Sequence, residues 1–452
     1  MTDEEICAVF RGAGDFVRRE LRCGELTIYA YFIDGLTAGG EIAEYVFKPL
    51  YENVTEGMMT FYQQALGGSV YSATAAACTD VADAARKLVN GFCVVLFPEV
   101  GAIAYEAKTP VRRAPSPPQV ENTVKGAKDA FVESMRVNTS LLRRHLRTPD
   151  LRLWQTTVGQ RTLTNVTILY LEGVTDPALV ERMKKRLDSI EINGFLTPSA
   201  VEESVTGSRA TAFPLLQYTE RTDRFCQGLL DGRVGLLVDG LPLGYLAPVD
   251  LHYLMESPED QSRDYISASA IRILRWIALL TGLLLPGLYI AMTSFHSGMI
   301  PVPLRDSIIN SREAVPFSPA IEVLGLLIAF ELLQESGIHL PQAVGQSVSI
   351  IGGIVMGTAA VEAGLISSMA LISVSIAGIC GFVQPNRDLA TACRVWRFLI
   401  SSASAAVGLA GAAAATGVLL IHLGRLKSMG VPYLYSKGSL VRARIKNNSE
   451  KS

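Results

Sequence analysis

Three glutamates interrupt an otherwise apolar stretch at residues 319–337. Glu331 and Glu335 are four residues apart and therefore share one face of a helix, whereas Glu322 falls on the opposite side. Carboxylates at membrane depth are costly and usually face a wet cavity, a charged partner or an ion path. We therefore predict that the two-glutamate face lines or gates a pore. The alternative is a helix on the membrane surface whose acids reach water. The predicted pore-lining or gating residues are Glu331, Glu335, Ile328 and Leu324.

Sequence patterns for catalysis or metal binding are missing from the chain. There is no phosphate-binding glycine loop of the Walker type, no HExxH zinc motif and no GxSxG nucleophile elbow. The seven cysteines include no CxxC pair, which favours reduced structural thiols over disulfides or a zinc site. We expect no enzymatic activity, no catalytic residues, no metal and no cofactor. The net charge of −2 gives no indication of a nucleic-acid partner.

The elements that must position the acidic stretch are long apolar runs. Four runs carry no charged side chain, and each is about as long as the roughly 17–25 residues of a membrane-spanning helix. Residues 318–336 are predicted to form a re-entrant or interfacial helix instead, and whether this helix spans the membrane stays open. The predicted full spans are at about 274–295, 343–362, 364–385 and 396–423.

The direction of the chain follows from its Lys and Arg residues. No secretory signal is recognisable at the start, so we expect the first domain to be cytoplasmic. With four crossings, nine cations near the spans lie on the cytoplasmic side and five outside, whereas a fifth crossing by 319–337 reverses these totals. We therefore expect four spans, cytoplasmic N- and C-termini, and residues 295–317 as a proline-stiffened outer loop.

Small residues gather on the last spans. They let helices approach closely, either within one chain or between copies of it. Packing inside the chain is the default expectation, and an oligomeric ring is the alternative that so much Ala and Gly also suits. The predicted helix-packing positions are Gly353, Gly357, Gly408 and Gly411.

The first 260 residues contain a weak internal repeat. Segments 31–50 and 169–187 share an apolar run, an acid–glycine pair and an amphipathic helix pattern. Segments 88–107 and 229–248 share a glycine-led turn and two β-rich runs around a second turn. The repeat predicts two similar α/β units whose strands are covered on both faces.

The predicted fold class is therefore α/β plus an all-α membrane domain, with two duplicated α/β subdomains before a polytopic helical bundle. The proline-rich stretch between the two units suits an extended linker. The predicted divisions are α/β subdomain 1 at 1–107, the linker at 108–123, α/β subdomain 2 at 124–265, the transmembrane domain at 266–428 and a basic cytoplasmic tail at 429–452.

Several stretches in combination resemble a known family. They run through most of the chain and are most specific from residue 124 onward. On these stretches the chain resembles the GerA-type spore germination receptor A subunit family. The stretches are FVESMRVNTSLLRRHLR, LYLEGVTDPALVERMKKRL, LLDGRVGLLVDG, SFHSGMIP, SREAVPF, ELLQESGIHLPQAVGQSVSIIGGIVMGTAAVEAGLIS and RLKSMGVPYL.

The resemblance implies a multi-pass protein of the spore (forespore) inner membrane, in contact with membrane lipid and with both termini on the core side. It implies two partners, a polytopic B-type subunit that senses the germinant and a C-type lipoprotein subunit. It also implies self-association into a homo-oligomer that acts as a nutrient-gated ion channel and triggers ion release and germination.

Other functions remain open beside this one. A close relative, the SpoVAF type, is associated with amplified ion release and not with nutrient sensing, and the helix in VNTSLLRRHLR does not separate the two types. A non-channel scaffold would use its helices as an anchor, and ion flux with the B and C subunits alone would favour it. An enzyme acting on a nucleotide or sugar is the least favoured interpretation, because its motifs are missing.

Overall fold

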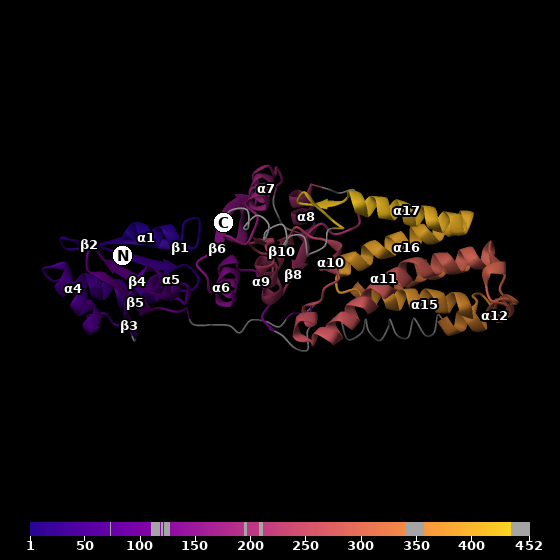
Figure 1. Cartoon of the computed structure of the whole chain (residues 1–452), viewed down its shortest axis with the longest axis horizontal. Helices are drawn as coiled ribbons and strands as arrows, with labels where there is room; N and C mark the ends of the chain where they lie inside the picture. The colour runs from indigo at the N-terminus through magenta and orange to yellow at the C-terminus, as the bar shows by residue number, and fades with distance from the viewer. Residues whose placement is uncertain are drawn as a thin grey trace. The chain divides into compact units, whose positions relative to one another are not determined.

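The computed structural model describes residues 1–72, 74–109, 118, 121, 127–193, 197–207, 211–339 and 357–434 (Figure 1). The chain divides into two compact units. One consists of Met1–Arg209 and Leu215–Pro248, and the other of Ala210–Pro214 and Val249–Ser452. Predicted subdomain 1 lies in the first unit, whereas predicted subdomain 2 lies there only in part, because its residues 210–214 and 249–265 belong to the second unit. Of the predicted linker, the structure describes residues 108, 109, 118 and 121.

The first unit begins with a five-stranded antiparallel sheet in the order β1-β2-β4-β5-β3. Its strands are β1 (Phe16–Cys23), β2 (Leu26–Ile33), β3 (Ala75–Cys78), β4 (Phe92–Phe97) and β5 (Gly101–Glu106). The helical segments around it are α1 (Asp3–Val9), α2 (Gly39–Glu41), η1 (Ile42–Phe47), α3 (Lys48–Glu52), α4 (Met58–Gln64), η2 (Ala65–Ser69) and α5 (Val81–Val89).

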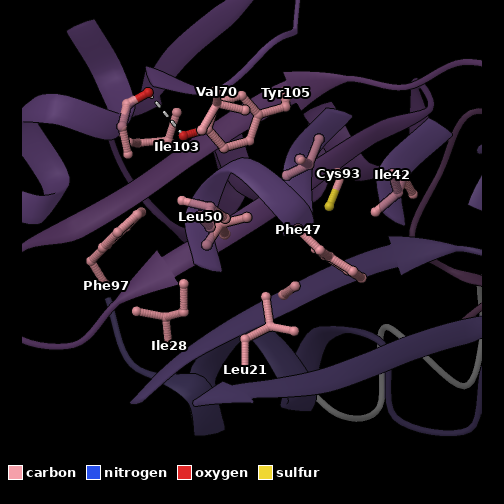
Figure 2. Close-up of a cluster of buried hydrophobic side chains, with 14 of the residues drawn as sticks. Leu21, Ile28, Ile42, Phe47, Leu50, Val70, Cys93, Phe97, Ile103 and Tyr105 are labelled. Carbon is pink, nitrogen blue, oxygen red and sulfur yellow. Dashed lines mark hydrogen bonds between the residues drawn. The ribbon is translucent and has the colours of Figure 1, made fainter. Parts of the chain in front are cut away.

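Both faces of this sheet are buried, as the continuous apolar strands predict. Along β4, Cys93 and Val95 face one core cluster while Val94 and Leu96 face the other. Figure 2 shows the first cluster, in which side chains of the sheet meet those of η1 and α3. In that cluster the hydroxyl of Tyr105 donates a hydrogen bond to the carbonyl of Ala65, at 3.1 Å.

A second sheet follows with the order β6-β7-β9-β10-β8. This is the order of the first sheet shifted by five strands, and α9 precedes β9 as α5 precedes β4. The predicted duplication is therefore confirmed. The elements are α6 (Met135–His145), β6 (Leu151–Val158), β7 (Thr164–Leu171), α7 (Pro177–Asp188), α8 (Pro198–Thr206), β8 (Gln217–Thr219), α9 (Thr222–Leu230), β9 (Val234–Val238) and β10 (Gly244–Ala247).

Every strand pair in the two sheets is antiparallel. The units are thus α+β in topology, although buried apolar strands are typical of parallel α/β layering as well. The reason is partly local, because two neighbouring pairs in each sheet, β1–β2 and β4–β5 in the first and β6–β7 and β9–β10 in the second, are joined by short turns. Gly24, with φ of +60°, lies in the turn between β1 and β2, and such a turn leaves no room for a crossover helix.

The second unit is mainly helical. Among the described residues, α11 is the one helix long and apolar enough to cross a membrane, and 28% of its most apolar window is buried. The elements are α10 (Leu251–Leu254), η3 (Pro258–Ser262), α11 (Tyr265–Ser294), η4 (Ser297–Met299), α12 (Val302–Arg312), α13 (Pro319–His339), α15 (Ser368–Phe382), α16 (Arg387–Val407), α17 (Leu409–Arg425), β11 (Lys427–Ser428) and β12 (Val431–Pro432).

The helices differ from the predicted spans in three places. The predicted span 396–423 is instead two helices, α16 and α17, joined at Gly408. The predicted outer loop contains α12, which Pro301 precedes as the N-cap residue. The predicted re-entrant segment is the continuous 21-residue helix α13. The predicted span 364–385 contains α15, and most of the predicted span 343–362 lies outside the described residues.

The β11–β12 hairpin extends ordered structure into the predicted tail. Tyr433 is fully buried, and its carbonyl accepts a hydrogen bond from the backbone amide of Leu251, at 2.9 Å. The hairpin therefore belongs to the helical unit, and residues 435–452 of the predicted tail lie outside the described residues.

Candidate functional site on helix α13

Helix α13 is packed into the helical unit through its N-terminal half. Val323 and Leu327 are buried in one apolar cluster with Ile290 of α11 and with Ala370 and Val374 of α15. These contacts place the first two turns of α13 against α11 and α15. The acidic residues of α13 are therefore held by a fixed backbone, which a site for chemistry or ion passage requires.

Glu331 joins α13 to α16 through two arginines. Its carboxylate accepts a hydrogen bond from Arg394 at 2.9 Å and another from Arg397 at 3.3 Å. The side chain of Arg397 is 4% exposed and also donates to the carbonyl of Ala377 in α15, at 3.1 Å. Glu331 itself remains 41% exposed. The predicted pore carboxylate is thus charge-paired on one side and open on the other.

The other members of the predicted pore face lie in different surroundings. Leu324 is partly buried against the cluster of α11, α13 and α15. Ile328 is 49% exposed, and Glu335 is exposed near the end of α13. The four residues thus share one helical side but differ in exposure, from the partly buried Leu324 to the exposed Glu335. Their assignment to a pore stays a prediction.

Glu322 has a role that the sequence prediction missed. It is 3% exposed and accepts hydrogen bonds from the backbone amide and hydroxyl of Ser367, at 2.9 and 2.6 Å. A nitrogen of Arg312 lies 3.2 Å from the same carboxylate. The acid therefore ties α12 and α13 to the N-terminus of α15. A sequence signal existed, since Ser367 precedes an apolar run as N-cap residues commonly do.

Two of the predicted packing glycines lie where α16 meets α17. Gly408 has φ of +68°, a backbone conformation that strains other residues. A Cβ on Gly411 would lie 2.0 Å from the carbonyl oxygen of Ala403, so the two helices meet at backbone distance. A Cβ on Gly357 would lie 3.5 Å from the side chain of Leu371, which is an ordinary van der Waals contact. Gly353 lies outside the described residues.

The contacts within the helical unit define the direction of each helix. Phe295, just after α11, lies beside Gly408 at the end of α16, so α11 and α16 run the same way. Ile290 near the end of α11 packs with Val323 and Ala370, near the starts of α13 and α15. Helices α13 and α15 therefore run opposite to α11, and α17 runs opposite to α16.

Comparison with known proteins identifies the family. The family model described as Bacillus/Clostridium GerA spore germination protein matches residues 4–448, so the chain belongs to the GerA family. Spore germination protein A1 of Bacillus subtilis is 36% identical over 80% of this chain and 77% of its own length. Spore germination protein KA of Bacillus subtilis is 31% identical over 93% of this chain and 78% of its own length.

A further relative and one solved structure are also similar. The uncharacterized membrane protein YfkQ of Bacillus subtilis is 33% identical over 98% of this chain and 87% of its own length. The crystal structure of the N-terminal domain of the A subunit of the Bacillus megaterium spore germinant receptor GerK3 has 24% identity and a TM-score of 0.42. That alignment covers 54% of this chain and 91% of the solved chain.

Proposed function

We propose that this protein is the A subunit of a spore germinant receptor and that its copies form a nutrient-gated ion channel in the spore inner membrane. Membership of the GerA family supports the receptor role. The observation that carries the channel role is the contact of Glu331 with Arg394 and Arg397 between apolar helices. The proposed role needs no enzymatic step.

The charge cluster suits a gate. Burying charges costs desolvation energy, so a partly buried acid–arginine cluster is weak evidence for stability and is more readily explained by a function. With Arg394 and Arg397 in place, the carboxylate of Glu331 is neutralised. A movement of α13 relative to α16 would release it and offer a negative site to a passing cation. Opening of the channel is therefore the separation of this acid from its two arginines.

The open side of α13 suits a subunit boundary. Ile321, Ile328 and Leu332 are each between 49% and 66% exposed in the single chain. In a homo-oligomer this side faces the neighbouring copy or the central path, and the apolar residues of α11 face lipid. Partners of the proposed complex are a B-type germinant-sensing subunit and a C-type lipoprotein. We propose them because the resemblance to GerA-type A subunits implies them, and because the chain belongs to the GerA family with spore germination proteins among its relatives.

The helix directions support a revised membrane topology with six crossings, in which α11 is long and apolar enough to cross by itself and α13, α15, α16 and α17 cross as members of the bundle packed with it. Five of these are α11, α13, α15, α16 and α17. The sixth is the predicted span at 343–362, most of which lies outside the described residues. An even number keeps both termini on the core side. The cations that divided nine to five with four crossings now divide twelve to two, with Arg305 and Arg312 alone outside. This distribution agrees far better with the positive-inside tendency.

Flux measurements on reconstituted protein test the channel. We expect liposomes that contain this chain with its B and C subunits to release monovalent cations when the germinant is added. Glu331→Gln should change that flux several-fold, because it removes the charge offered to the cation. Glu313→Gln is the matched control, because Glu313 is an exposed acid at the C-terminal end of α12. Equal flux from B and C subunits without this chain would contradict the proposal.

Labelling in intact membranes tests the topology separately. Ser307 lies in α12, which the six-crossing arrangement places outside. Ser307→Cys should react with a membrane-impermeant maleimide from the outer side. Reaction from the core side alone would overturn the orientation and leave the channel role to the flux measurement.

A further inference from the structure

A small pocket lies where the end of α15, the start of α16 and the middle of α11 meet. Its cavity volume is about 20 Å³, which is room for about one water-sized species and far less than a drug-sized ligand needs. Apolar and small residues form most of its wall. The lining that carries polar or charged groups is Gln384, Arg394, Arg397, Cys380 and Cys393.

Gln384 is the unusual member of this lining. It is 8% exposed, and neither its amide nitrogen nor its amide oxygen has a hydrogen-bond partner among the described residues. Buried polar atoms are nearly always hydrogen-bonded, because an unpaired one loses its contacts with water without replacement. The amide of Gln384 therefore indicates a bound species in the pocket that it lines.

The charge of the pocket defines the chemistry of that species. Both charged side chains of the lining are arginines, and Arg397 is almost fully buried. Glu331 compensates one positive charge between the two arginines from outside the lining. One positive charge of the pair is left over. Arg394 is 25% exposed, but Arg397 is 4% exposed, and an anion is attracted strongly to a cation so far from water. A water molecule would satisfy the amide of Gln384 but would leave this charge uncompensated.

We propose that the pocket binds a small monovalent anion of the halide class, held by the amide N–H of Gln384 and by the guanidinium groups of Arg394 and Arg397. The same arginines hold Glu331, so the bound anion also stabilises the position of α16 against α13 and α15. The site shares Arg394 and Arg397 with the proposed gate, whereas Gln384 belongs to the pocket alone. Its test does not depend on channel activity.

Thermal stability in different salts measures the binding. The full chain is placed in nanodiscs of zwitterionic lipid, and its Tm is measured while sodium chloride replaces sodium gluconate at constant ionic strength. A ligand that binds the folded state raises the Tm in a saturable way. We expect such a rise with chloride and bromide and none with sulfate, which is too large for the pocket. No chloride-specific rise in the wild type would overturn the proposal.

Two variants of Gln384 and one control locate the site. Gln384→Leu should weaken the apparent chloride affinity at least tenfold. Gln384→Glu should raise the Tm in gluconate and abolish the response to chloride, because its carboxylate replaces the anion beside the arginines. Ser373→Ala is the control, because Ser373 of α15 is likewise buried, has a hydroxyl with no hydrogen-bond partner in the described part of the chain, and does not line the pocket. A chloride response in Gln384→Leu equal to that of wild type would overturn the assignment.

Discussion

Glu322 caps the N-terminus of α15 by accepting hydrogen bonds from both the backbone amide and the hydroxyl of Ser367. The two residues are 45 positions apart, and the carboxylate is also within 3.2 Å of Arg312. One buried acid thus joins the end of α12 to the starts of α13 and α15. An acid at a helix N-terminus is favoured further by the helix macrodipole. The acid that lies away from the predicted pore face is therefore a structural residue of the helical unit.

Substitution of Glu322 should destabilise the helical unit. Glu322→Ala leaves the backbone amide and the hydroxyl of the buried Ser367 without their acceptor, and each such group costs about 1–3 kcal/mol. Since a loss of 1 kcal/mol lowers the Tm by about 2–4 °C in a unit of this size, we expect a decrease of several degrees. The measurement is thermal unfolding of the purified protein in detergent. An unchanged Tm would show that the cap contributes nothing.

The structural role of Glu322 changes which variants can test the pore. Glu322→Gln is unsuitable as a neutral control for Glu331→Gln. The two carboxylate oxygens of Glu322 face the donors of Ser367 and of Arg312, so the amide of Gln would place N–H groups against one of them. Glu313→Gln has no such effect. We expect its Tm to stay within about 1 °C of wild type, as is usual for an exposed position.

The contact between α16 and α17 gives a second prediction. Gly411→Val should prevent the two helices from packing, because its Cβ would overlap the carbonyl of Ala403. Gly417→Val is the matched control in the same helix, since a Cβ at Gly417 meets nothing within 4 Å. We expect the first variant to aggregate or to be degraded, and the second to elute as wild type in size-exclusion chromatography. Similar elution of both variants would contradict the tight contact.

The strand repeat could be predicted from sequence, and the break between α16 and α17 could not. The repeat is visible because apolar runs and acid–glycine pairs recur locally in the order of the strands. The run 398–422 is different, because a charge-free stretch of small residues has the same composition whether it is straight or folded at Gly408. What decides is the close contact of Gly411 with Ala403, which forms only after the chain folds back.

The candidate site also combines a feature that the sequence predicts with one that it does not. The spacing of Glu331 and Glu335 predicts from sequence alone that they share one helical face. The structure has a helix there, α13. The partners of Glu331 lie more than 60 residues further on, in α16, where sequence treated Arg394 and Arg397 as markers of topology. Pairing over such a distance depends on how the helices pack, and no local pattern encodes it.

A third prediction concerns pH and the pair of His145 and Asp129. The ring of His145 lies 2.6 Å from the carboxylate of Asp129, and this hydrogen bond raises the pKa of His145. Burial would raise the pKa of Asp129, but the hydrogen bonds from His145 and Thr222 lower it to about 2. The charge of Asp223 also favours the protonated ring.

The sign of the effect follows from these two shifts. His145 contributes stability in full below its unfolded pKa of about 6.5, and this is lost as the pH rises through the higher folded pKa. Asp129 contributes in full above its unfolded pKa of 3.8, and this is lost as the pH falls toward about 2. The Tm difference between wild type and His145→Gln should be largest near pH 5 and should shrink above pH 7. A difference that does not vary with pH would exclude the charged pair.

The fourth prediction separates a buried ion pair from an exposed one in the first unit. Arg143 of α6 donates two hydrogen bonds of 2.8 Å to Asp15, and the two side chains are 1% and 4% exposed. Removing one partner of a buried pair leaves the other charge uncompensated and costs about 3–5 kcal/mol. Arg143→Met should therefore lower the Tm strongly.

Arg136→Met is the matched control for an exposed pair. It removes a pair with Asp34 at 2.7 Å whose side chains are 59% and 50% exposed, and exposed pairs contribute about 0–1 kcal/mol. We expect the Arg143 variant to unfold at least 5 °C below the Arg136 variant by circular dichroism, and equal values for the two would refute the role of burial.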